Sequence, residues 1–102
     1  MLSLITVSEA QKKLAENTRQ KRLQQGFTQK ALAERSGVAL STLRLFERTG
    51  VISLESFLKL QMILGGLDGI LKETQVKEIE FLSIDDVLKS SKAKIRQRGK
   101  RT

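Results

Sequence analysis

The sequence of 102 residues contains no cysteine, no histidine and no proline. Without cysteine the chain forms no disulfide and no thiolate metal site, and without histidine it lacks the commonest general base and a frequent metal ligand. The absence of proline suits a mostly helical chain, because proline interrupts helices. Apolar runs are short, and none approaches the roughly 20 residues of a transmembrane helix. We therefore expect a cytosolic, helical protein with no metal, no cofactor and no membrane segment.

Motifs of enzyme chemistry are also missing. The sequence has no glycine-rich phosphate loop and no convergent pair of carboxylates. Asp85 and Asp86 are better explained as helix-capping and surface residues. We therefore expect a binding protein rather than an enzyme.

Charge is distributed unevenly along the chain, whose formal net charge is +8. Residues 1–52 carry nine Lys and Arg against four Asp and Glu, whereas residues 53–88 carry three against seven. Residues 89–102 carry seven basic residues and no acidic one. Basic ends suggest a polyanionic partner, and the acidic middle suggests a separate contact surface. A tail that only keeps the protein soluble is the alternative.

Residues 6–72 are expected to form a domain of five helices. The first begins in a capping-box pattern, Thr6 with Glu9 three residues later. Thr28 and Ser53 are N-caps for the second and fourth helices, and the fifth covers about residues 67–72. The inner face of the first helix is expected to contain the residues that recur at helical spacing, Val7, Ala10, Leu14 and Thr18.

Residues 29–46 have the pattern of two short helices joined by a tight turn. Ala33 is small where the helices cross, and Gly37 allows the positive φ of a sharp turn. The apolar residues expected to meet in one core are Leu32, Val38, Leu43 and Phe46. This pattern predicts a helix-turn-helix, a unit that reads duplex DNA.

The remaining residues follow different patterns. Lys77, Ile79 and Phe81 alternate with Glu78 and Glu80, which predicts one short strand over residues 76–81. Ser83 and Asp86 are spaced to begin a short helix that ends at about Leu88. We therefore expect a dimerisation or partner-binding segment at 73–88 and a basic, disordered tail at 89–102.

Residues 14–72 resemble the phage-repressor helix-turn-helix family, also called the XRE or Cro type. The matching positions are Arg22, Gly26 to Gln29, Leu32-Ala33, Gly37-Val38, Thr42-Leu43, Phe46-Glu47 and Leu64-Gly65. The run at residues 53–58, the expected strand and the basic tail are similar to antitoxins of the HipB type. That similarity implies a bacterial, cytoplasmic antitoxin that represses its own operon and binds a kinase-like toxin.

In the family that the chain resembles, the third helix lies in the major groove. The resemblance implies base contacts from Leu40, Ser41 and Arg44, with Leu45 at the margin. Arg44 has the chemistry for a bidentate pair with guanine, whereas Ser41 discriminates poorly and Leu40 offers only apolar contact. The alternatives are a phosphate contact for Arg44, and partner packing or simple exposure for Leu40.

Further residues are expected to contact phosphate or to support the fold. The resemblance implies a phosphate contact from Gln29 and an ion pair between Arg22 and Glu47 that joins the first helix to the third. Residues at or near helix starts, where backbone N–H groups favour anions, add candidate phosphate contacts, with capping alone as the alternative for each of them. These candidates are Thr28, Lys30 and Thr42. Arg19 and Lys21 are expected to flank the duplex, and the alternative is that their helix face is only exposed to solvent.

Position 39 departs from the family pattern. Ala39 stands where Ser or Thr usually caps the third helix, and losing such a cap typically costs about 1 kcal/mol. Ser41 is therefore an alternative start for this helix, which would change the residues that reach the bases.

A single domain of this kind contacts only a short half-site, so we expect a homodimer on an inverted repeat of double-stranded DNA. The candidate interface residues, for several of which core packing is the alternative, are Leu67, Ile70, Leu71, Ile79 and Phe81. A phage- or plasmid-type repressor without a toxin, and a protein-interaction module that no longer binds DNA, are the alternative functions.

Overall fold

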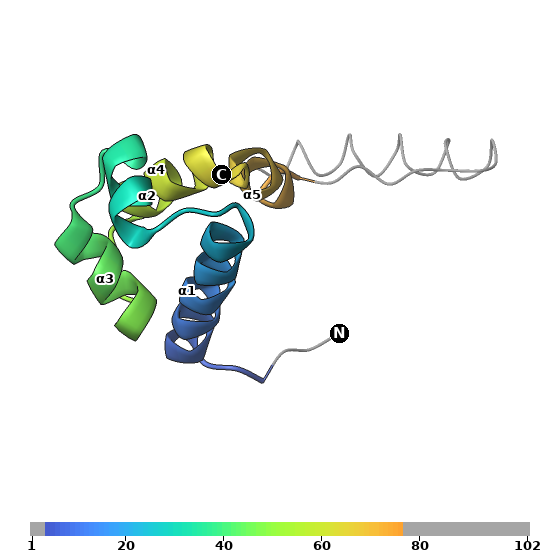
Figure 1. Ribbon diagram of the computed structural model, residues 1–102. Coiled ribbons are helices and arrows are strands. Elements are labelled where there is room, and N and C mark those ends of the chain that lie inside the picture. Colours follow the sequence, from blue (N-terminus) through green and yellow to red (C-terminus); the bar gives the residue numbers. More distant parts are fainter. Residues whose placement is uncertain (1–3, 77–102) are drawn as a thin grey trace, which may run out of the picture.

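The computed structural model describes residues 4–76, in which five α-helices follow one another (Figure 1). The helices are α1 (Val7–Gln24), α2 (Gln29–Ser36), α3 (Leu40–Thr49), α4 (Leu54–Leu64) and α5 (Leu67–Glu73). This confirms the expected all-α fold. The expected strand at 76–81 lies outside the described residues except for Val76, and the helix at 83–88 and the tail lie wholly outside them.

Polar side chains fix the starts of three helices where the sequence predicts them. Thr6 Oγ1 accepts a hydrogen bond from Glu9 N at 3.1 Å, and Glu9 Oε1 accepts one from Thr6 N at 2.8 Å, which completes the capping box. The bond from the Thr6 backbone, then the Thr6 hydroxyl, lowers the pKa of Glu9 below its usual value. Thr28 and Ser53 cap α2 and α4 with one hydrogen bond each, accepted from Ala31 N and Ser56 N.

The core lies where α2, α3 and α4 meet, with α1 packed across α3. Leu32, Leu43, Phe46 and Leu60 are its largest fully buried side chains. The Phe46 and Phe57 rings meet edge to face with centroids 5.8 Å apart, a favourable geometry for aromatic pairs. The four residues expected to share a core across the turn are all buried, which confirms that prediction.

The expected inner face of α1 is confirmed for Thr18, which is buried, and Ala10 is half-buried, but the prediction is wrong for Val7 and Leu14. The buried residues of α1 are Ala15, Thr18 and Arg22, whereas the Val7 and Leu14 side chains are 78% and 47% exposed. α1 is rotated from the expected orientation because polar side chains on its buried face find hydrogen-bond partners on other helices. Thr18 Oγ1, for example, accepts a hydrogen bond from Gln61 Nε2 of α4 at 3.1 Å. A polar inner face leaves no apolar periodicity for a sequence pattern to detect.

α3 begins at Leu40, so the alternative start at Ser41 is not observed. Ala39 has the extended backbone of an N-cap, with φ −60° and ψ 142°, but makes no side-chain capping bond. Packing of Leu40, Leu43 and Phe46 against the core therefore fixes the start of this helix without a cap.

We expect Ala39→Ser to stabilise the protein by about 1 kcal/mol, because a serine hydroxyl there can accept a bond from a free N–H of the first turn. Ser53→Ala, which removes an existing cap, is the matched control and should destabilise by a similar amount. Urea unfolding followed by circular dichroism measures both. An unchanged midpoint for Ala39→Ser beside a lowered one for Ser53→Ala would contradict a missing cap at α3.

Candidate nucleic-acid interface

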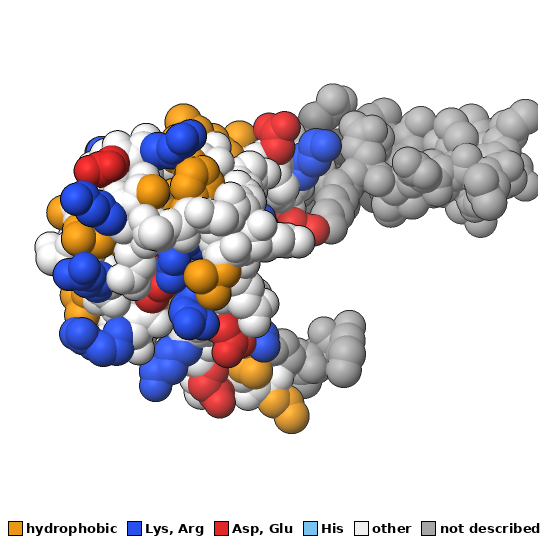
Figure 2. Space-filling view, in the orientation of Figure 1, with side chains coloured by type: hydrophobic (Ala, Val, Ile, Leu, Met, Phe, Trp, Pro, Cys, Tyr) orange, Lys and Arg blue, Asp and Glu red, His pale blue; other side chains and the backbone are white. Residues whose placement is uncertain are grey.

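One face of α3 points away from the core and is exposed. Ser41, Arg44, Leu45 and Arg48 are all exposed, and their spacing of three and four residues places them on one stripe of the helix. Leu43 and Phe46 occupy the opposite side and are buried. Lys and Arg side chains gather along this side of the molecule (Figure 2). We call these four residues the α3 stripe.

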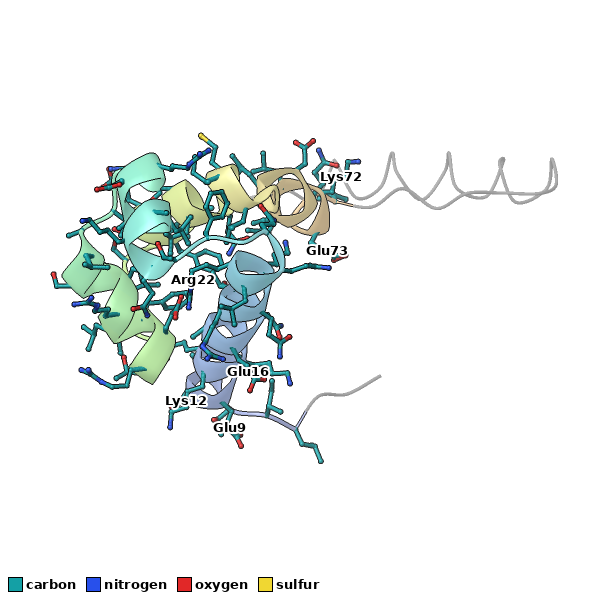
Figure 3. The ribbon with its side chains drawn as sticks, in the orientation of Figure 1. Glu9, Lys12, Glu16, Arg22, Lys72 and Glu73 are labelled. Carbon is teal, nitrogen blue, oxygen red and sulfur yellow. The ribbon has the colours of Figure 1, made fainter. Side chains whose placement is uncertain are left out.

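A buried ion pair supports this helix from behind. Arg22 Nε donates to Glu47 Oε2 at 2.7 Å and Arg22 Nη2 donates to Glu47 Oε1 at 3.0 Å, which makes the pair bidentate. The Arg22 and Glu47 side chains are only 7% and 5% exposed. Arg22 Nη1 also donates to the Phe27 carbonyl at 2.9 Å. Arg22 points from α1 toward α2 and α3 (Figure 3), so the pair joins α1 to α3 and to the loop before α2.

Gln29 connects the ion pair to the α3 stripe. Gln29 Nε2 donates to Glu47 Oε1 at 3.0 Å, and Gln29 Oε1 accepts from Arg44 Nε at 3.4 Å. Because Glu47 accepts hydrogen bonds and donates none when ionised, it orients the Gln29 amide with its nitrogen inward. The oxygen of Gln29 then faces Arg44. The first residue of α2 thereby restrains an exposed arginine on α3.

Arg48 is a site residue that the sequence analysis missed. It lies four residues after Arg44, so the helical period alone would have placed it on the same stripe. Arg48 lines a hollow of about 360 Å³ between α3 and α1, together with Lys12 and Arg19. Glu16 and Glu47 line the same hollow and offset part of its charge. Figure 3 shows Lys12 and Glu16 on α1.

The other predicted DNA contacts differ in accessibility. Arg19 and Lys30 are exposed, and Lys21, their expected neighbour on the duplex, is exposed as well. Leu40 is half-buried and packs against the core, which leaves only part of its side chain for a base. Thr28 Oγ1 accepts from Ala31 N at 3.0 Å, so its hydroxyl caps α2, and Thr42 is half-buried.

The predicted interface residues lie apart from the α3 stripe. Leu67 and Ile70 are half-buried and Leu71 is exposed, all on α5, which contains no buried residue. Ile79 and Phe81 lie outside the described residues. In residues 4–76 no cluster of acidic side chains is arranged to hold a metal ion, and no helix there is both long and apolar enough to cross a bilayer.

The arrangement suits insertion of α3 into a duplex. An α-helix with its side chains is about 10–12 Å wide, which matches the major groove of B-DNA at about 12 Å. The α3 stripe presents two arginines on a helix held in place by the core and by the Arg22–Glu47 pair. Arginine forms bidentate hydrogen bonds with guanine and contacts phosphate.

A family model described as helix-turn-helix matches residues 19–68. This range begins in the second half of α1 and ends at the start of α5, so it includes α2, α3 and the turn between them. Comparisons with curated proteins and with solved structures found no match. Residues 19–68 therefore form a helix-turn-helix domain of the XRE, or phage-repressor-like, type, which is the DNA-binding domain of transcription regulators.

Proposed function

We propose that the protein is a sequence-specific transcriptional repressor that binds an inverted repeat of duplex DNA as a homodimer. The observation that carries the proposal is the α3 stripe: an exposed helix face with Arg44 and Arg48, held against a closed core. A rigid helix loses little conformational freedom when it enters the major groove, so its base contacts are available for discrimination.

The residues divide into two roles. Arg44 and Ser41 lie in the first half of α3 and are proposed to contact base edges, with Leu45 beside them. Gln29, Lys30 and Arg19 surround α3 on neighbouring helices and are proposed to contact phosphates, as are Thr28 and Thr42 through the helix starts. Arg48, at the end of the stripe beside Arg19 and Lys12, joins the phosphate group.

A homodimer is proposed because one α3 covers only a half-site. The exposed Leu71 and the half-buried Leu67 on α5 lie away from the α3 stripe, so a contact there leaves α3 free. Selection of binding duplexes from a random pool tests the whole proposal. It should return an inverted repeat, whereas a module without DNA specificity would return no enriched sequence.

Arg44→Ala and Arg48→Ala are expected to act differently on DNA binding. Arg44→Ala should cost about 1–3 kcal/mol on the selected duplex and relax the preference at one base pair. Arg48→Ala should weaken binding to all duplexes alike and reduce the salt-dependence slope by about 1. Fluorescence anisotropy on the selected duplex, its single-base variants and a scrambled duplex, at several salt concentrations, measures both.

Each variant is the control for the other, because each removes one exposed arginine from α3 and changes the net charge by the same amount. Uniform weakening by Arg44→Ala would assign Arg44 to a phosphate instead of a base. Relaxed specificity in Arg48→Ala would place that arginine at a base edge.

An antitoxin role is a second candidate. The run at residues 53–58, which resembles HipB-type antitoxins, forms the N-cap and first residues of α4, where Leu54 is exposed. Leu54 lies outside the α3 stripe, so this run does not overlap the proposed base contacts. Affinity purification of the tagged protein from its native host, with co-purified protein and DNA sequenced, distinguishes the roles: a kinase-like protein supports the antitoxin, and DNA alone supports a repressor without a toxin.

A further inference from the structure

An apolar groove runs along α1 on a surface away from the α3 stripe. One hollow of about 580 Å³ lies between α1, α4 and α5, and a second of about 280 Å³ continues toward the loop before α4. Leu14 and Phe57 line both hollows, so the two adjoin each other at these side chains. No residue of the α3 stripe lines either one. We call this the α1–α4 groove.

The groove exposes apolar side chains that the core does not need. Leu14 on α1 is 47% exposed and Leu54 on α4 is 72% exposed, and both line the groove with Phe57. Ile70 of α5 contributes at the other end. Covering these side chains would remove apolar surface from water, which favours an apolar occupant.

We propose that residues 78–88 of the same chain occupy the α1–α4 groove. The described chain reaches Val76 directly after α5, and α5 itself forms one wall of the groove, with Glu73 and Thr74 in the lining. Figure 3 shows Glu73 on α5. The segment therefore begins beside the site that it is proposed to fill.

The composition and length of this segment fit the groove. Six of its eleven residues are large and apolar: Ile79, Phe81, Leu82, Ile84, Val87 and Leu88. With residues 83–88 in the expected short helix and residues 78–82 extended, the segment spans about 25 Å, whereas the groove lining on α1 runs from Gln11 to Lys21, about 15 Å, so the segment can reach along the groove. A short tether also raises the local concentration of the segment, which favours the chain's own segment over that of a second copy.

Charge contributes less than apolar contact. Residues 78–88 contain four acidic side chains and no basic one. Lys21 is the one basic residue in the lining of either hollow, and Glu73 is the one acidic residue. Other cations of α1 lie elsewhere: Arg22 is paired with Glu47, and Lys12 and Arg19 line the hollow beside α3. The apolar contacts therefore supply the binding, and Lys21 is the one charge in the groove that attracts the segment.

Disulfide trapping in the full chain tests the proposal, because the natural sequence has no cysteine to interfere. The trapping variant is Asn17→Cys with Ile84→Cys, since Asn17 is an exposed residue in the groove lining. Mild oxidation should give a disulfide within one chain, seen as a monomer mass lower by two hydrogens. The matched control is Lys30→Cys with Ile84→Cys, because Lys30 is exposed on α2 outside the groove.

The alternatives give different products. A disulfide between chains would mean that the segment of a second copy fills the groove, and this would overturn the proposal. Equal oxidation of the trapping and control variants, or no disulfide in either, would also overturn it.

A second pair of changes shows whether apolar contact drives the docking. Leu54→Asp or Phe81→Asp, each added to the trapping variant, should slow disulfide formation about tenfold, because losing one buried apolar side chain changes an equilibrium by at least that factor. Circular dichroism should show unchanged helix content, since Leu54 is exposed. An unchanged oxidation rate in both would overturn the proposal. DNA binding is a separate readout, so failure here leaves the repressor function untouched.

Discussion

Glu47→Ala is expected to destabilise the protein by about 3–5 kcal/mol, because it leaves the buried guanidinium of Arg22 without its carboxylate. Arg22 would retain the Phe27 carbonyl as an acceptor, but an amide oxygen does not neutralise its charge. Small domains are stable by only about 5–15 kcal/mol, so the variant loses a large part of its reserve. Urea unfolding at neutral pH, followed by circular dichroism, measures the loss.

The control is the double variant Arg22→Met with Glu47→Leu. Replacing both charges with apolar side chains of similar size leaves no charge stranded, so the double variant should be more stable than Glu47→Ala. Equal losses in the two proteins would mean that packing, rather than the unpaired charge, explains the effect. A loss below about 1 kcal/mol for Glu47→Ala would show that the pair behaves like a solvated surface pair.

The double variant also separates folding from DNA recognition. With Glu47 replaced, Gln29 loses the acceptor that orients its amide, and Arg44 loses the restraint that Gln29 provides. A folded double variant should therefore still bind DNA through its charge but discriminate less between sequences.

The helix-turn-helix was predictable because its signals are local. A cap at Thr28, the positive φ of Gly37 and apolar residues at helical spacing act within about twenty residues of one another. These signals agree with one another and with the packed structure, where Leu32, Val38, Leu43 and Phe46 are all buried.

The orientation of α1 was not predictable from the same kind of signal. Its buried face consists of a small residue and two polar ones, Ala15, Thr18 and Arg22, and their partners lie far along the chain. Gln61 is 43 residues from Thr18, and Glu47 is 25 residues from Arg22. Val7 and Leu14, the apolar residues that suggested a neighbouring face, are exposed. Resemblance to a family indicated the Arg22–Glu47 pair where the periodicity of α1 did not.

The hydrogen bond between Gln29 and Arg44 was predictable only in part. Both residues were candidates for DNA contact, but no pattern indicated that one restrains the other across 15 positions. Arg48 could have been found, because it follows Arg44 by one helical turn. Its neighbours Lys12 and Arg19 come from α1, and only the packing of α1 against α3 brings them together.

That packing depends on Gly50, and we expect Gly50→Ala to destabilise the protein by about 2–5 kcal/mol. Gly50 ends α3 with φ +85° and is buried against the backbone of α1. A Cβ at this position would lie 2.8 Å from Gln11 C and 2.9 Å from Lys12 N. The left-handed conformation costs an alanine about 1–2 kcal/mol, and forcing the two helices apart adds about 1–3 kcal/mol.

Gly65→Ala is the matched control for this change. Gly65 ends α4 with φ +88°, and a Cβ there meets no atom within 4 Å. Both variants share the cost of the left-handed conformation, and alanine restricts both unfolded chains equally. The difference in their free energies of unfolding, measured with urea, therefore reports the close approach of α1 and α3. Equal losses would mean that α1 can move away from α3 at little cost.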